Sequence, residues 1–106
     1  MTIDRLATVL QVDDLRDAVA AWRQVLGVEP SFVDGDRWAQ FDVGTARLAL
    51  AGCDRIDAPG VMLKVGDLDA EHARLAEAAP IARGAHERRF RLAMPSGAVA
   101  IFYQPL

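Results

Sequence analysis

Apolar and polar residues alternate with two different periods along the chain. Residues 7–12 alternate with a period of two and are rich in branched side chains, which predicts a strand. Residues 15–26 place apolar side chains on one stripe at helical spacing, and Gly27 is expected to end this helix. Three short extended runs follow, near 31–33, 37–42 and 46–51. The first part of the chain is therefore predicted to fold as βαβββ.

The same order of elements returns after a shift of 53 residues, which is half of the 106-residue chain. A second alternating strand is predicted at 60–65, followed by a second helix at 68–79 that Pro80 ends. Asp14 and Asp67 precede the two helices, where a carboxylate accepts hydrogen bonds from the first turn. Further extended runs lie near 81–83, 88–93 and 98–104. We predict one α+β domain built of two tandem modules, with module one at about 1–51, a linker at about 52–59 and module two at about 60–106.

Composition and charge narrow the classes of function. Hydrophobic residues make up 52% of the chain and the formal net charge is −3, and this acidity argues against nonspecific nucleic-acid binding. No apolar stretch approaches the roughly 20 residues of a membrane span, and the first residues lack the basic start of a signal peptide. Cys53 is the only cysteine, which excludes an internal disulfide and a multi-cysteine zinc site. We expect a soluble, cytoplasmic protein with no membrane or nucleic-acid partner.

Two segments carry a resemblance to a known superfamily. Residues 12–27 contain VDDL followed by AWRQVLG, and residues 94–102 read MPSGAVAIF. They resemble the strand-to-helix motif and the closing strand of the glyoxalase/bleomycin resistance/extradiol dioxygenase superfamily, also called the vicinal oxygen chelate superfamily. The resemblance covers essentially the whole chain. It implies two βαβββ modules whose curled, mixed sheets surround a concave cavity, with the helices on the outside.

Metal-using members of this superfamily bind a divalent ion through side chains on the first and last strands of each module. Placed residue by residue, these positions fall here on side chains without an oxygen or nitrogen donor, namely Ala7, Leu48, Gly60 and Ile101. Divalent metals need several converging donors, so we expect no metal and no other cofactor. This departure argues against the metal-dependent isomerase, lyase and dioxygenase activities of the superfamily.

Alternation assigns one face of each predicted sheet to the cavity. If Leu10 and Val12 pack on the first helix, the side chains between them point the other way. On the last strand of module one, Ala46, Leu48 and Leu50 are expected to point inward, by analogy with module two. The predicted ligand-binding residues are Val9, Gln11, Trp38, Gln40, Leu48, Met62, Arg89, Arg91, Ile101 and Tyr103.

Several of these residues also have a simpler explanation. Trp38 is compatible with a dimer interface, Tyr103 with an ordinary strand tyrosine, and Gln11 with a polar strand end. His72 lies in the apolar stripe of the second helix, which favours a structural role. Cys53 has no histidine near it in sequence to act as its base, which argues against a nucleophile.

The predicted lining is largely apolar, with an indole, a phenol, two amides and a few cations. This profile favours a metal-independent protein that binds a small aromatic or drug-like molecule, comparable to the drug-sequestering antibiotic resistance members of the superfamily. The alternative is a lyase, isomerase or dioxygenase with non-standard metal ligands or no metal, and no catalytic residue is assigned. A third interpretation is an interaction module without a ligand. We expect a homodimer, with the modules pairing either within the chain or across the dimer.

Overall fold

A computed structural model of the protein describes residues 3–52, 60–95 and 97–106. The chain divides into two compact units. The first unit comprises residues 7–59, and the second comprises residues 1–6 and 60–106. Most of the predicted linker lies outside the described residues. No helix in the described part of the chain is long and apolar enough to cross a membrane.

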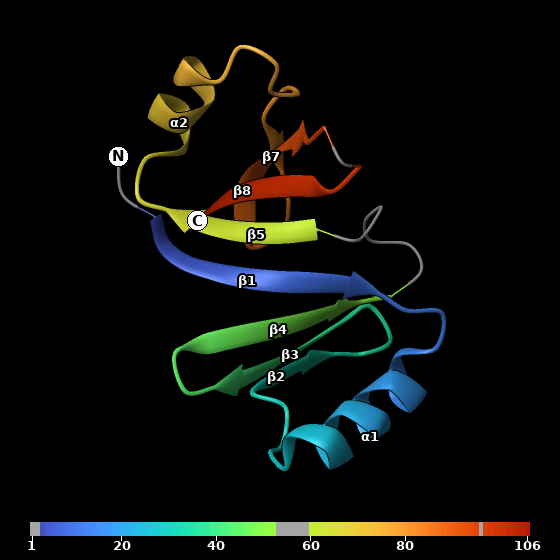
Figure 1. The fold of residues 1–106 in the computed structure, drawn as a ribbon. Coiled ribbons are helices and arrows are strands. Elements are labelled where there is room, and N and C mark those ends of the chain that lie inside the picture. The colour runs from blue at the N-terminus through green and yellow to red at the C-terminus, as the bar shows by residue number, and fades with distance from the viewer. Residues whose placement is uncertain (1–2, 53–59, 96) are drawn as a thin grey trace. The chain divides into compact units, whose positions relative to one another are not determined.

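The first unit contains one helix and a four-stranded sheet (Figure 1). Its strands follow the order β2-β3-β4-β1, and β4 runs parallel to β1 while the other neighbours are antiparallel. Residues 3–6 of β1 belong to the second unit. The elements are β1 (Ile3–Gln11), α1 (Leu15–Leu26), β2 (Phe32–Asp34), β3 (Trp38–Val43) and β4 (Ala46–Ala51).

The second unit repeats this arrangement. Its strands follow the order β5-β8-β7-β6, with β8 parallel to β5. The α+β class and the twofold βαβββ order are therefore confirmed. The elements are β5 (Gly60–Val65), α2 (Leu68–Arg74), β6 (Ala82–Arg83), β7 (Glu87–Ala93) and β8 (Val99–Pro105).

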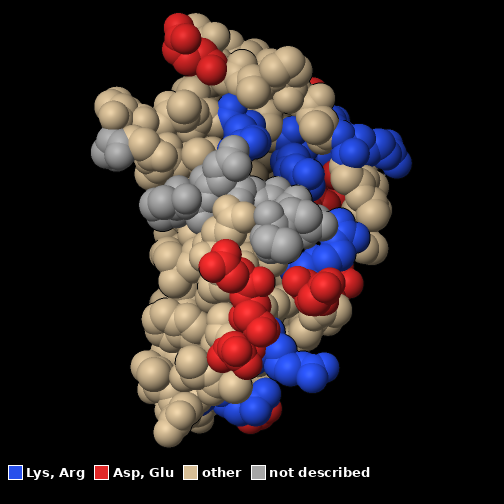
Figure 2. All heavy atoms as spheres, turned by 90° about the vertical axis from the view of Figure 1, so that its right-hand side faces the viewer, with Lys and Arg blue, Asp and Glu red and all other residues tan. Residues whose placement is uncertain are grey.

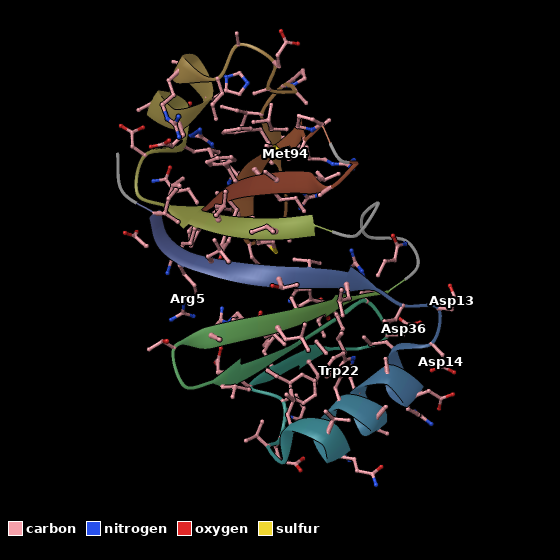
Figure 3. The ribbon with its side chains drawn as sticks, in the orientation of Figure 1. Arg5, Asp13, Asp14, Trp22, Asp36 and Met94 are labelled. Atoms are coloured by element: carbon pink, nitrogen blue, oxygen red, sulfur yellow. The ribbon has the colours of Figure 1, made fainter. Side chains whose placement is uncertain are left out.

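The helix α1 has the predicted bounds because both of its ends carry local signals. Asp14 lies in an extended conformation and its carboxylate accepts a hydrogen bond from the Asp17 backbone N–H at 3.1 Å. Gly27 adopts the left-handed conformation, with φ of 72°, and its N–H donates to the Arg23 carbonyl oxygen. Between the caps, Trp22 reaches toward the sheet and packs against the core (Figure 3).

The helix α2 is shorter than predicted, because it ends at Arg74 rather than at residue 79. The backbone at residue 79 is tied to a strand, since the Ala79 N–H donates to the Arg91 carbonyl oxygen at 2.9 Å. The Ala79 carbonyl oxygen lies 2.8 Å from Nε2 of His72. Residue 79 also precedes Pro80, which disfavours helical geometry there. These contacts hold the segment after Arg74 against β7.

Each unit has its own core beneath its helix. The first is formed by Leu15, Val19, Ala39, Phe41 and Leu50, and the second by Val65, Leu68, Phe90 and Phe102. In the second core, the rings of Phe90 and Phe102 stack with centroids 4.8 Å apart. His72 meets Phe90 edge-on at 5.0 Å. These contacts agree with the structural role predicted for His72.

A side chain of β8 holds the start of α2. The Gln104 amide nitrogen donates to the Gly66 carbonyl oxygen at 2.8 Å, and the Leu68 N–H donates to the Gln104 amide oxygen at 2.9 Å. Gln104 thereby ties the β5–α2 connection to β8. It also gives a hydrogen-bond partner to an N–H of the first helical turn, which has none within the helix.

We predict that Gln104→Ala lowers the free energy of unfolding by about 1 kcal/mol, because it removes a helix-capping interaction. Urea unfolding followed by circular dichroism measures this loss. Gln24→Ala, on the exposed surface of α1, is the matched control and is expected to stay within about 0.5 kcal/mol of the wild type. Equal stability of the two variants would contradict the capping role.

Candidate functional site

The strand register sorts each sheet into two faces. Laterally paired residues point to the same side of a sheet, and successive residues alternate. In the first unit, Leu10 pairs with Leu50, and both pack against the core under α1. We call this side the helix face and the opposite side the far face, and we apply the same names to the second unit.

The far face of the first unit consists of three lateral rows. Across β1, β4 and β3 they are Gln11–Ala51–Trp38, Val9–Ala49–Gln40 and Ala7–Arg47–Asp42. The middle of this face is small and apolar, with Ala7, Val9, Ala49 and Ala51 all buried. On this face, β3 therefore carries an indole and an amide, next to small apolar side chains on β1 and β4.

Polar groups on this face hold one another in place. The Trp38 indole N–H donates to the side-chain oxygen of Gln40 at 3.1 Å, which fixes the orientation of the ring. Arg47 and Asp42 form a two-pronged ion pair across β4 and β3, with Nε to Oδ1 at 2.7 Å. The sheet already holds both pairs close together. Trp38 and Gln40 lie on the same side of β3, and Asp42 and Arg47 are cross-strand partners.

The far face of the second unit also has three rows that cross three strands, with three cations among them, and β8 and β7 add the pair Pro105–Glu87. Across β5, β8 and β7 the rows are Gly60–Val99–Ala93, Met62–Ile101–Arg91 and Lys64–Tyr103–Arg89. A phenol thus lies between an ammonium and a guanidinium, next to a row with two apolar side chains. Nη1 of Arg89 also contacts Oε1 of Glu87 at 3.4 Å, which is a long contact that neutralises it only in part.

Nine of the ten predicted ligand-binding residues lie on the far faces. Val9, Gln11, Trp38 and Gln40 are in the first unit. The others, in the second unit, are Met62, Arg89, Arg91, Ile101 and Tyr103. Their role in binding stays a prediction, whereas their positions follow from the register.

The predicted inward orientation of Leu48 is wrong. Leu48 packs against the core under α1, and Leu50 is buried in that core. Ala46 has the same parity along β4, so the three residues predicted to point inward share the helix face. Ala49 takes the far-face position, and sequence reasoning missed it.

The orientation of Leu48 was predicted wrongly because the offset between the two modules changes by one residue. Val9 pairs with Ala49, and Met62 pairs with Ile101, so the offset between the last strands is 52 residues rather than 53. The sequence held a signal for this, because large Leu48 and Leu50 alternate on β4 with alanines. The larger side chains belong under the helix, where they bury more apolar surface.

The residues at the superfamily's metal positions do not fit a divalent ion. Ala7, Gly60 and Ile101 lie on the far faces without a donor atom, and neither Leu48 nor Ala49 supplies one. A Cβ added at Gly60 would lie 3.0 Å from the Val99 carbonyl oxygen, so any side chain there would crowd β8. Across residues 3–52, 60–95 and 97–106, no group of three or more His, Cys, Asp or Glu could hold a metal.

Two other features of the sequence bear little on the site. Cys53 and Ser96 lie outside the described residues. Acidic and basic side chains share the face shown in Figure 2, and Figure 3 places Asp13, Asp14 and Asp36 at one end of the first unit. Asp14 caps α1, which gives it a structural explanation.

The sequence matches no family model and no curated protein. Solved structures do match. An NAD-dependent benzaldehyde dehydrogenase from Legionella pneumophila is 13% identical, with a TM-score of 0.85 over 95% of this chain and 99% of that chain. A glyoxalase/bleomycin resistance protein/dioxygenase superfamily member from Vibrio splendidus 12B01 is 16% identical, with a TM-score of 0.76 over 97% of this chain and 99% of that chain.

The chain has the fold of the glyoxalase/bleomycin resistance/dioxygenase superfamily. The fold expected from residues 12–27 and 94–102 is thereby confirmed. A hypothetical protein from Methanosarcina mazei is also similar, with 17% identity and a TM-score of 0.59 over 100% of this chain and 95% of that chain. At these identities the likeness is one of fold.

Proposed function

We propose that this glyoxalase-fold protein binds a small, planar aromatic or drug-like molecule without a metal, and that the molecule carries a negative group. The row Lys64–Tyr103–Arg89 on the second far face is the observation that carries the proposal. Two cationic residues there are the strand neighbours of a tyrosine, and all three side chains are half-buried. Such a row suits a carboxylate or a similar anion, because a guanidinium binds two oxygens and a phenol donates one hydrogen bond.

Apolar side chains beside the cations suit a planar ligand, and the first far face offers a separate aromatic surface. Met62 lies in the neighbouring row beside Ile101 and is half-buried, so part of its side chain is open to a ligand. On the first far face, Gln40 holds the Trp38 ring in one orientation. A ring that is already ordered loses little side-chain entropy when a planar molecule stacks on it.

Charge distribution favours the second unit as the place for an anion. By sequence, the first unit carries nine acidic and five basic residues, whereas the second carries six acidic and seven basic ones. The second unit therefore carries a net charge of +1 and the first unit −4, which favours the second far face over the first for an anionic ligand.

We expect 4-nitrobenzoate to bind at least about tenfold more tightly than the neutral 4-nitrobenzamide, because one charge-assisted pair contributes on the order of 1.5 kcal/mol. Isothermal titration calorimetry measures both affinities. Arg89→Gln, which removes one cation of the row Lys64–Tyr103–Arg89, is expected to reduce the preference for the acid. Arg83→Gln, whose side chain belongs to the helix face of the same unit, is the matched control.

A second readout tests the first far face. Trp22→Phe leaves Trp38 as the remaining tryptophan, so quenching of its emission by 4-nitrobenzoate reports contact with the ring. The proposal fails if aromatic acids produce neither binding heat nor a shift in melting temperature, or if Arg89→Gln and Arg83→Gln behave alike.

We predict that the purified protein contains no stoichiometric metal and that dialysis against a chelator leaves its melting temperature unchanged. The positions of the superfamily's ligands offer no donor atoms, so no tightly bound ion contributes to the stability of the folded state. Elemental analysis and differential scanning calorimetry measure these two quantities. One equivalent of nickel, zinc, iron or manganese would contradict the prediction and favour a metal-dependent lyase, isomerase or dioxygenase.

We also propose that the protein acts in the cytoplasm as a homodimer and belongs among the binding members of its superfamily, which include drug-sequestering resistance proteins. Support for self-association comes from the edge of the first sheet. Phe32 on edge strand β2 is about half exposed, and Val25 and Val43 of the same unit are exposed too. Sedimentation equilibrium tests this proposal, since a dimer has twice the 11.5 kDa mass of the chain.

A further inference from the structure

A groove on the helix side of the first unit lies outside the proposed far-face site. It runs between α1 and the segment around β2, and its volume is about 390 Å³. This volume falls within the range of small-molecule sites. The residues that line it are Leu15, Arg16, Val19, Ala20, Arg23, Pro30, Val33 and Gly35.

The groove exists because one helix is too narrow for the sheet it covers. An α-helix with its side chains is about 10–12 Å wide, and strands lie about 4.8 Å apart, so a helix covers roughly two strands. The helix α1 packs on β3 and β4, and β2 is the next strand outward (Figure 1). Val33 pairs with Ala39 on the helix face, yet it remains 47% exposed.

The walls of the groove are aliphatic. Leu15, Val19 and Ala20 come from α1, while Pro30 and Val33 face them from the other side. Among the described residues that line the groove, none is aromatic. These walls suit a flexible alkyl chain better than a planar ring.

The charged groups of the groove lie on one stripe of α1. Arg16, Ala20 and Arg23 are spaced four and three residues apart, so they follow one another along the same side of the helix. Arg16 and Arg23 are about 10 Å apart along the helix axis. Nε of Arg23 already pairs with Glu29 Oε1 at 3.2 Å. No hydrogen bond or ion pair ties the Arg16 guanidinium to another residue that the structure describes.

We infer that this groove binds a medium-chain aliphatic monocarboxylate, with the carboxylate at Arg16 and the alkyl chain lying along α1 toward Arg23. One available guanidinium calls for one negative charge. The aliphatic walls then bury successive methylenes of the chain, and the distance to Arg23 limits how many of them fit. This site is separate from the far faces and does not depend on the proposed function.

Binding is tested by titrating the ¹⁵N-labelled protein with octanoate and recording amide chemical shifts. We expect the shifts to gather in residues 15–23 and 30–35. Affinity should rise by about fourfold for each methylene from hexanoate to octanoate, because each buried CH₂ contributes that factor. The neutral analogue 1-octanol should bind three- to fivefold more weakly than octanoate, which is the usual strength of an exposed charge pair.

Three variants assign the site. Ala20→Trp fills the groove and should abolish octanoate binding, whereas Ala21→Trp, at an exposed alanine of α1 outside the groove, should not. Arg16→Gln should remove the preference for octanoate over 1-octanol. Both alanines are exposed, so unchanged circular dichroism spectra verify that the two tryptophan variants fold.

The inference is overturned if octanoate shifts no amides, if the shifts lie on the far-face strands, or if Ala20→Trp binds octanoate as the wild type does. These outcomes are distinct from a failure of the proposed function, which depends on Arg89 and on aromatic acids. A protein that binds 4-nitrobenzoate through Arg89 but does not bind octanoate would refute the groove alone.

Discussion

Phe90→Ala is expected to lower the free energy of unfolding by about 3–5 kcal/mol. The Phe90 side chain is 1% exposed, and its ring stacks on Phe102 and meets His72 edge-on. Alanine would leave a cavity among these rings and remove their mutual contacts. Because domains of this size have roughly 5–15 kcal/mol of stability in total, the variant should unfold at a much lower urea concentration. Urea unfolding followed by circular dichroism measures the loss.

The same substitution connects the core to the candidate site. Arg89 and Arg91 flank Phe90 on β7 and point to the opposite face. Phe90→Leu, which keeps most of the apolar volume, is the control and should cost less than about 1.5 kcal/mol. A loss below about 0.5 kcal/mol for Phe90→Ala, which is typical of surface positions, would contradict the packing described for this core.

The helix α1 could be predicted to the residue because its limits are set locally. Asp14 and Gly27 act within one turn of the helix they bound, and both signals are visible in the sequence. The end of α2 could not be predicted in this way. It depends on the hydrogen bond from Ala79 to Arg91, twelve residues further along the chain.

The orientation of β4 shows a second limit. A one-residue error in register turns every side chain of a strand to the other face. The repeat offset of 53 is correct for Val9 and Met62 but has slipped by one at Ala49 and Ile101. The alternation of leucine and alanine along β4 predicts the orientation of this strand better than the repeat does. The reason is that each strand buries its larger apolar side chains independently of the other module.

Contacts between segments far apart in the chain could not be predicted from the sequence. Gln104 reaches Gly66 and Leu68 from 36 or more positions away, and no local pattern distinguishes it from an exposed strand residue. The groove beside α1 could not be predicted from the sequence either. It follows from how many strands one helix covers, which depends on the strand order and not on the residues that line the groove.

The absence of donors at the metal positions, in contrast, could be recognised from the sequence, and the structure adds a physical reason at one of them. At Gly60 the neighbouring strand comes so close that a side chain would press on the Val99 carbonyl oxygen. A ligating histidine there would therefore require β5 and β8 to move apart. The far faces offer chemistry that needs no ion, with a fixed indole on one and a row of cations around a phenol on the other.

Gly52→Ala is expected to lower the free energy of unfolding by about 1–3 kcal/mol, as overpacking a close contact does. A Cβ at this position would collide with the Asp36 carbonyl oxygen and lie 3.2 Å from the Arg37 Cα. These are backbone atoms, so no side-chain rotation relieves the contact. The Gly52 N–H also donates to the Arg37 carbonyl oxygen at 2.8 Å, and separating the two segments would break that bond.

The effect should reach the candidate site, because Trp38 follows Arg37 directly and begins β3. Trp38 emission in a Trp22→Phe background is therefore expected to change together with the melting temperature, which should fall by roughly 4–8 °C for each kcal/mol lost. Gly66→Ala is the matched control, since its added Cβ would meet nothing nearer than the Asp4 carboxylate at 4.0 Å. A Gly52→Ala protein as stable as Gly66→Ala, with unchanged Trp38 emission, would show that the backbone does not approach Gly52 as closely as described.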